Sequence, residues 1–164
     1  MIYALIGENI SGKTKYVRSL YNKYGAEHCL YNRKTDPTVE TTAYNMEALS
    51  ILQRIMLADQ IMPSSVISIV GSPFTPSGGF LNLMSLVCKK RDYLLLDEPD
   101  TILSFNETQW LYDYLSAASN LYKEVWLVTH DRETMGITDV RFCTILNSTN
   151  LKEIEEDEAN GILT

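Results

Sequence analysis

Apolar residues along the chain fall into two patterns: short continuous runs, and longer stretches with a spacing of three or four residues. A short run flanked by polar residues or glycine is typical of a strand, and the longer spacing is typical of a helix. The short runs predict strands at residues 2–6, 28–31, 66–70, 93–96, 125–129, 142–146 and 151–154. The helical spacing predicts helices at residues 13–24, 46–59, 80–90 and 106–121.

The order of these elements predicts an α/β fold. Strands that alternate with helices favour a mainly parallel sheet that is flanked by helices on both faces. Only residues 147–150 separate the last two strands, which therefore predict a short antiparallel hairpin near the C-terminus. Segments 33–40 and 71–79 are rich in polar residues, proline or glycine and are expected to be loops. Asn106 followed by Gln109 resembles a capping box at the start of the last helix.

Composition and charge narrow the class of protein. The length of 164 residues suits one domain, residues 1–164, and 45% apolar residues is usual for a globular protein. No apolar run is long enough to span a membrane, and residues 1–6 lack the basic start of a targeting peptide. Residues 153–158 are acidic and are expected at the surface.

The net charge of −7 argues mildly against direct nucleic-acid binding but leaves it open. The main basic run, Lys89–Arg91, is expected to be a solvated helix end. The three cysteines are scattered without metal-ligand spacing and are expected to be buried; they are Cys29, Cys88 and Cys143. This cysteine usage indicates a reduced, cytoplasmic protein.

The segment Gly7–Thr14 matches the phosphate-loop pattern G-x-x-x-x-G-K-[ST] in full. It follows a predicted strand and begins a predicted helix, which is the structural context that the pattern requires. Glycines let successive backbone N–H groups point at phosphate oxygens, and the helix N-terminus favours the same anion. Lys13 is expected to bridge the β- and γ-phosphates of ATP, and the Thr14 hydroxyl to ligate Mg²⁺. The other residues expected to bind the phosphates are Gly7, Asn9, Ile10, Ser11 and Gly12.

A second motif is an apolar strand that ends in two acids, Asp97 and Glu98, followed by Pro99. A buried parallel strand delivers its C-terminal residues to the edge of the sheet where ligands bind. Asp97 is therefore expected to hold Mg²⁺, directly or through water. Glu98 is expected to polarise the attacking water as the general base.

These two motifs resemble those of the ABC ATPase superfamily, and we favour its non-transport branch of SMC-like and RecF-like ATPases. Ser77-Gly78-Gly79 resembles the core of the family signature, and the segment 128–131 resembles its switch-histidine segment. The resemblance implies that His130 contacts the γ-phosphate. It also implies that ATP lies between two such domains, with Ser77, Gly78 and Gly79 of one domain reaching the γ-phosphate on the other. Asn9 matches an asparagine that is frequent in the family's phosphate loop.

The chain departs from the family pattern at several positions. Pro76 and Phe80 replace the usual leucine and glutamine of the signature, and Ser104 stands where an aspartate is expected. The interval between the phosphate loop and the signature is too short for the family's helical arm. The early antiparallel strands and the adenine-stacking aromatic residue also have no counterpart. The glutamine that contacts Mg²⁺ in the family has two candidates, Gln53 and Gln60.

The sequence therefore predicts an enzyme, a Mg²⁺-dependent ATPase that acts as an ATP-driven dimerisation switch for a partner. The partner is expected to be a second copy or another ABC-type chain. Two alternatives remain open: a P-loop kinase of nucleotides or small molecules, and an ATP-binding regulatory module that does not hydrolyse. The process that hydrolysis drives is not determined by these motifs.

Overall fold

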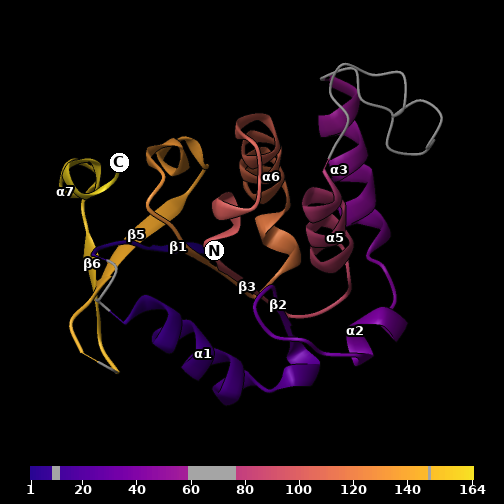
Figure 1. Cartoon of the computed structure of the whole chain (residues 1–164), viewed down its shortest axis with the longest axis horizontal. Coiled ribbons are helices and arrows are strands. Elements are labelled where there is room, and N and C mark those ends of the chain that lie inside the picture. The colour runs from indigo at the N-terminus through magenta and orange to yellow at the C-terminus, as the bar shows by residue number, and fades with distance from the viewer. Residues whose placement is uncertain (9–11, 59–76, 148) are drawn as a thin grey trace.

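The computed structural model describes residues 1–8, 12–58, 77–147 and 149–164 (Figure 1). The strands are β1 (Ile2–Leu5), β2 (Cys29–Tyr31), β3 (Tyr93–Asp97), β4 (Glu124–Val128), β5 (Val140–Ile145) and β6 (Leu151–Ile154). The helices are α1 (Lys13–Tyr24), α2 (Thr38–Thr41), α3 (Met46–Ala58), α5 (Gly78–Val87), α6 (Phe105–Ala118) and α7 (Glu156–Ile162). The strand predicted at 66–70, and most of the loop predicted at 71–79, lie outside the described residues.

One six-stranded sheet in the order β2-β3-β4-β1-β5-β6 forms the centre of the molecule. The first five strands in this order pair in parallel, and β6 pairs antiparallel with β5. The predicted mainly parallel sheet with a C-terminal hairpin is therefore confirmed. In the register of β4, Val128 lies opposite both Leu5 of β1 and Asp97 of β3. The segments that follow these three strands consequently meet at the same edge of the sheet.

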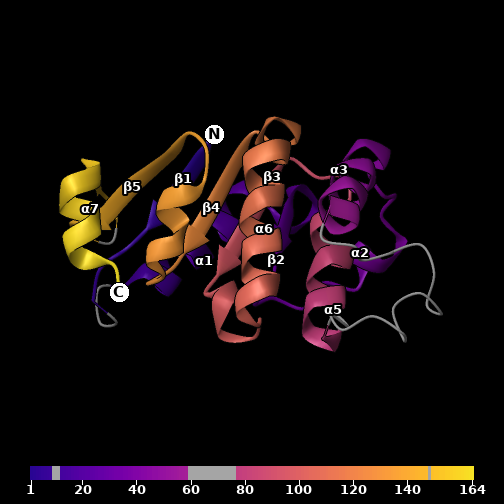
Figure 2. The same ribbon diagram turned by 90° about the horizontal axis from the view of Figure 1, so that it is seen from above.

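Helices cover both faces of the sheet (Figures 1 and 2). Helix α1 packs on one face through a cluster that includes Val17 and Leu20, and α3, α5 and α6 cover the other. The larger cluster, on the second face, contains fully buried residues from α5 and α6 such as Phe80 and Leu111. Helix α7 closes the β5–β6 end of the sheet and buries Ala159 there. The acidic side chains of the segment 153–158 are exposed, as expected.

Two predicted helix starts were wrong, α5 by two residues and α6 by one. Helix α6 begins at Phe105, because the capping box is formed by Ser104 and Glu107, not by Asn106 and Gln109. Serine is a stronger N-cap than most residues, and a glutamate three positions later completes the reciprocal bonds. Helix α5 begins at Gly78, so the predicted loop does not extend through residue 79.

The basic run Lys89–Arg91 was expected to be solvated, and this is wrong for two of its three residues. Lys89 is 6% exposed, and its ammonium donates to the main-chain oxygens of Glu40 and Thr42. The Arg91 guanidinium donates to main-chain oxygens next to β2 and forms a 2.8 Å ion pair with Asp36. A buried cation requires such partners. The two side chains therefore tie the segment that follows β2, which includes the short helix α2, to the end of α5 and the start of β3.

Candidate functional site

The described part of the phosphate loop surrounds the ammonium group of Lys13. This residue begins α1, is 4% exposed, and donates to the main-chain oxygens of Gly7 at 2.8 Å and Glu8 at 2.7 Å. Gly12 has a φ of 84°, a left-handed conformation that disfavours any side chain, just before the helix. The ammonium is therefore held by the main chain at the start of the phosphate loop, and its contact with the β- and γ-phosphates stays a prediction.

Burial lowers the pKa of Lys13, although the negative charges of Glu98 and Asp97 oppose that shift. Leu5 and Asp97 both lie opposite Val128 of β4, so the segments that carry the two sequence motifs meet at one edge of the sheet. Thr14 is exposed in the first turn of α1. The proposed phosphate contacts of Asn9, Ile10 and Ser11 lie outside the described residues and stay predictions.

Asp97 ends β3 with its side chain completely buried. Among the described residues, neither of its carboxylate oxygens has a hydrogen-bond partner. A buried carboxylate without a partner is unfavourable, and it fits a divalent cation that prefers oxygen ligands. Thr14 and Asp97 are the residues that would hold Mg²⁺. The described residues include no cluster of three potential metal ligands, and a Mg²⁺ site completed by substrate phosphates does not need one.

Glu98 follows Asp97 and has a left-handed backbone, with φ 48° and ψ 52°. This conformation is unfavourable for a residue with a Cβ atom, and such strain is concentrated at functional sites. The carboxylate lies between two partners. His130 Nε2 is 3.2 Å from Oε1, and Arg33 Nη2 is 3.3 Å from Oε2. The structure therefore brings together Glu98 and His130, for which the sequence predicted separate roles.

Asn32 and Arg33 were not identified from the sequence, yet they hold the end of β3 in place. The Asn32 side chain accepts from the Asp97 N–H at 2.8 Å and donates to the Asp97 main-chain oxygen at 3.1 Å. Arg33 Nε donates to the same oxygen at 3.2 Å. The signal for both was their position directly after the strand predicted at 28–31. Because β2 is the parallel neighbour of β3, this position lies beside the acid pair.

Of the two candidate glutamines, Gln53 lies exposed on α3, and among the described residues no hydrogen bond joins it to Asp97 or Glu98. Gln60 lies outside the described residues.

The signature-like segment forms a separate place on the molecule. Ser77 caps α5 by accepting from the Phe80 N–H, and its own N–H donates to Glu107 at 2.6 Å. The Ser77 hydroxyl donates to the same carboxylate at 3.0 Å. Helix α5 covers the β2 end of the sheet, away from the start of α1 (Figure 2). Among the described residues, no hydrogen bond joins Ser77, Gly78 or Gly79 to the phosphate loop.

Glu107 joins the starts of two helices. It is 4% exposed and also accepts from the Ser104 N–H at 2.9 Å. Burial alone would raise the pKa of Glu107, but the hydrogen bonds from Ser104 and Ser77 outweigh burial and lower it. The carboxylate is therefore a charged link between α5 and α6. Gly79 also lies close to the segment before α6, since a Cβ atom added at Gly79 would lie 3.4 Å from the Ile102 main-chain oxygen.

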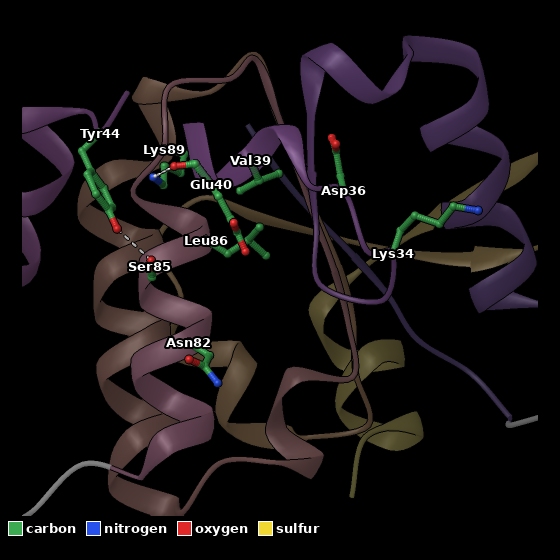
Figure 3. Close-up of a pocket in the computed structure, with 9 residues that line it drawn as sticks. All are labelled: Lys34, Asp36, Val39, Glu40, Tyr44, Asn82, Ser85, Leu86 and Lys89. Atoms are coloured by element: carbon green, nitrogen blue, oxygen red, sulfur yellow. Dashed lines mark hydrogen bonds between the residues drawn. The ribbon is translucent and has the colours of Figure 1, made fainter. Parts of the chain in front are cut away.

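A hollow of about 410 Å³ lies away from this edge, between the segment after β2 and α5 (Figure 3). In it, the Tyr44 hydroxyl contacts Ser85 and Lys89 lies 3.8 Å from the centre of the Tyr44 ring. None of the predicted site residues lines the hollow. The hollow is therefore a separate feature from the candidate nucleotide site.

Sheet order and the position of these residues define an α/β fold of the P-loop ATPase class. No protein-family model matches the chain, and no curated protein matches it by sequence. Solved structures do match. The chain is 14% identical to a cobalt-transport ATP-binding protein, with a TM-score of 0.56 over 93% of this chain and 68% of that one.

Two further solved structures also match the fold of the chain. A metal-chelate type ABC transporter in an inward-facing conformation is 15% identical, with a TM-score of 0.52 over 99% of this chain and 75% of that one. A chain from the complex of archaeal ribosomal stalk protein aP1 and ribosome recycling factor aABCE1 is 19% identical, with a TM-score of 0.54 over 87% of this chain and 31% of that one. At such identities the shared property is the fold, that of ABC-type ATPase domains. None of the helices in the described ranges is long and apolar enough to cross a membrane.

Proposed function

We propose that this protein binds ATP with Mg²⁺ and hydrolyses it, as an ABC-type ATPase domain of the non-transport, SMC-like and RecF-like branch. The observation that supports this most is the meeting of Lys13, Asp97, Glu98 and His130 at one edge of the sheet. Each of these side chains has the chemistry that phosphoryl transfer to water needs. The ABC-type ATPase fold is consistent with that reaction.

The residues divide the reaction between them. Lys13 would exchange the oxygens of Gly7 and Glu8 for those of the β- and γ-phosphates. Mg²⁺, held by Thr14 and Asp97, would neutralise charge on the phosphates. Glu98 accepts a proton from water while the water oxygen bonds to the γ-phosphorus. The bond from that phosphorus to the bridging oxygen breaks, and its electron pair remains on ADP.

We further propose that ATP joins two copies of the domain, or this domain and another ABC-type chain. Helix α5 begins at Gly78, and the first N–H groups of a helix have no partner within it, so those of Gly78 and Gly79 suit an anion supplied by a partner. Beside it, Ile102 is 58% exposed and Phe105 is 69% exposed. Large apolar side chains at such exposure next to a polar anion site are typical of a protein interface. The resulting dimer would close on ATP and open after hydrolysis.

The test is light scattering of Glu98→Gln with and without Mg·ATP. Loss of the base stops hydrolysis but leaves nucleotide binding, so the ATP-bound state accumulates. We expect a monomer that becomes a dimer only with Mg·ATP, and ATP turnover reduced at least about 100-fold. Glu156→Gln, an exposed acid on α7, is the control and should hydrolyse like the natural sequence. A Glu98→Gln protein that binds ATP and stays monomeric would refute the homodimer.

Assays on the same purified protein also test the two alternative functions, a kinase and a regulatory module. Phosphate transferred from ATP to a nucleoside or nucleotide, in place of water, would identify a kinase. Tight binding of ATP with no turnover by the natural sequence would identify a regulatory module.

A further inference from the structure

Arg33 contacts the candidate general base, although no motif includes it. Its Nη2 lies 3.3 Å from Oε2 of Glu98, and its Nε donates to the main-chain oxygen of Asp97 at 3.2 Å. His130 lies 3.2 Å from the other carboxylate oxygen. Both oxygens of Glu98 therefore already have a partner, and an attacking water would have to compete with one of them.

The ion pair between Arg33 and Glu98 is weak, so a ligand that binds the guanidinium more strongly can replace Glu98. The two side chains are 47% and 29% exposed, and a pair at such exposure contributes little to stability. A phosphate offers the planar guanidinium two parallel hydrogen bonds and a larger negative charge. The contact with the Asp97 main chain keeps the guanidinium beside the acid pair while its outer nitrogens change partner.

We propose that Arg33 binds the terminal phosphate of ATP, and pairs with Glu98 when that phosphate is absent. The proposal rests on the ATPase function proposed above. When the guanidinium moves to the γ-phosphate, Oε2 of Glu98 is free to take the proton of the attacking water. The water oxygen bonds to the γ-phosphorus, the bond to the bridging oxygen breaks, and its electron pair leaves with ADP. Arg33 then stabilises the negative charge on the transferred group. ADP has no γ-phosphate, so it leaves Arg33 paired with Glu98.

The experiment compares Arg33→Ala and Arg33→Lys with Arg54→Ala, a control at an exposed arginine on α3. Binding of ADP and of the non-hydrolysable analogue AMP-PNP is measured by calorimetry with Mg²⁺, and kcat and KM are measured with ATP. For Arg33→Ala we expect AMP-PNP binding to weaken about 10- to 100-fold, since a hydrogen bond to a charged group is lost. ADP binding should change less than about twofold, and kcat should fall about 10- to 100-fold.

Arg33→Lys should recover part of the AMP-PNP affinity, because lysine keeps the positive charge but lacks the planar guanidinium that forms two parallel hydrogen bonds. Arg54→Ala should match the natural sequence in both assays. Equal weakening of AMP-PNP and ADP by Arg33→Ala would overturn the proposal. An Arg33→Ala protein that hydrolyses ATP as fast as the natural sequence, or faster, would also overturn it, since Arg33 would then only restrain Glu98.

The binding assay also separates this proposal from the one on which it rests. A natural sequence that binds AMP-PNP without hydrolysing ATP would refute the ATPase function, and the two affinities would still decide the contact of Arg33. A natural sequence that binds neither nucleotide would refute both proposals.

Discussion

Asp97 lies at the end of β3 with no exposed surface and, within the described residues, no hydrogen bond to its carboxylate. Its main chain, in contrast, forms three hydrogen bonds with the side chains of Asn32 and Arg33. The backbone is thus fixed while the side chain keeps its capacity for a ligand. At the residue scale, the site is organised so that stability is given up where the proposed cation and phosphates would bind.

This arrangement predicts the effect of Asp97→Asn. The substitution removes a buried charge, so the protein without metal should gain about 1 kcal/mol in free energy of unfolding. The gain in melting temperature that Mg·ATP gives the natural sequence should be lost, since a carboxylate ligand is missing. Thermal unfolding with and without Mg·ATP checks both parts. An Asp97→Asn protein that Mg·ATP stabilises as strongly as the natural one would exclude Asp97 as a ligand.

At the scale of elements, Glu107 connects the start of α5 to the start of α6. It caps α6 with Ser104 and accepts two hydrogen bonds from Ser77. The segment that leaves Glu98 and the segment that carries Ser77 are therefore attached to one buried carboxylate. A change at the nucleotide site that moves the residues after Glu98 would be transmitted to the start of α5 through this link.

The lowered pKa of Glu107 predicts how stability depends on pH. A carboxyl whose folded pKa lies below its unfolded value contributes stability that is complete above the unfolded value. This contribution is lost as the pH falls below about 4.5 and through the folded pKa. Glu107→Gln should therefore be less stable at pH 7 by about 1–3 kcal/mol. It should also lose less stability than the natural sequence between about pH 5 and pH 3.

Urea unfolding at a series of pH values measures this difference. Glu133→Gln, an exposed acid in the turn after β4, is the matched control and should follow the natural sequence. Parallel pH curves for Glu107→Gln and the natural sequence would show that Glu107 is not the group responsible.

At the scale of the whole molecule, sheet order determines which parts of the chain meet. The strands β1, β3 and β4 lie side by side, so their C-terminal ends bring Lys13, Glu98 and His130 to one edge. The signature-like segment lies elsewhere, at the β2 end of the sheet (Figure 2). Within one copy, no hydrogen bond joins Ser77 to the described residues of the phosphate loop. A second domain with bound ATP is the simplest source of a phosphate for Ser77.

This arrangement predicts the effect of a charge in the exposed apolar pair. Phe105→Glu, or Ile102→Glu, should abolish the dimer that Glu98→Gln forms with Mg·ATP, because dimerisation would bury an unpaired charge. ATP binding by the monomer should change less than about twofold, since neither residue lies at the phosphate loop. Light scattering and calorimetry measure these two effects. Met46→Glu, at a residue that is 72% exposed on α3, is the control, and its dimer should persist.

Much of the fold was predictable because local sequence patterns specify local structure. Short apolar runs predicted the five parallel strands, since a parallel strand buried on both faces is almost continuously apolar. The antiparallel strand β6 was predicted from the short connection that follows β5. The helix starts at residues 78 and 105 were missed, because serine caps compete with neighbouring polar residues and only the folded backbone selects among them. The burial of Lys89 and Arg91 was also missed, since their partners lie about fifty residues away in the chain.

The sequence by itself determined the α/β class, the phosphate loop and the acid pair. Each of these depends on residues that are adjacent or regularly spaced, so a pattern along the chain is sufficient. Only the tertiary structure decided that Asn32 and Arg33 belong to the site and that Glu107 links two helices. It also placed Ser77 on a separate part of the surface. These relations join residues that are distant in the chain, and the pairing of strands and packing of helices brings them into contact.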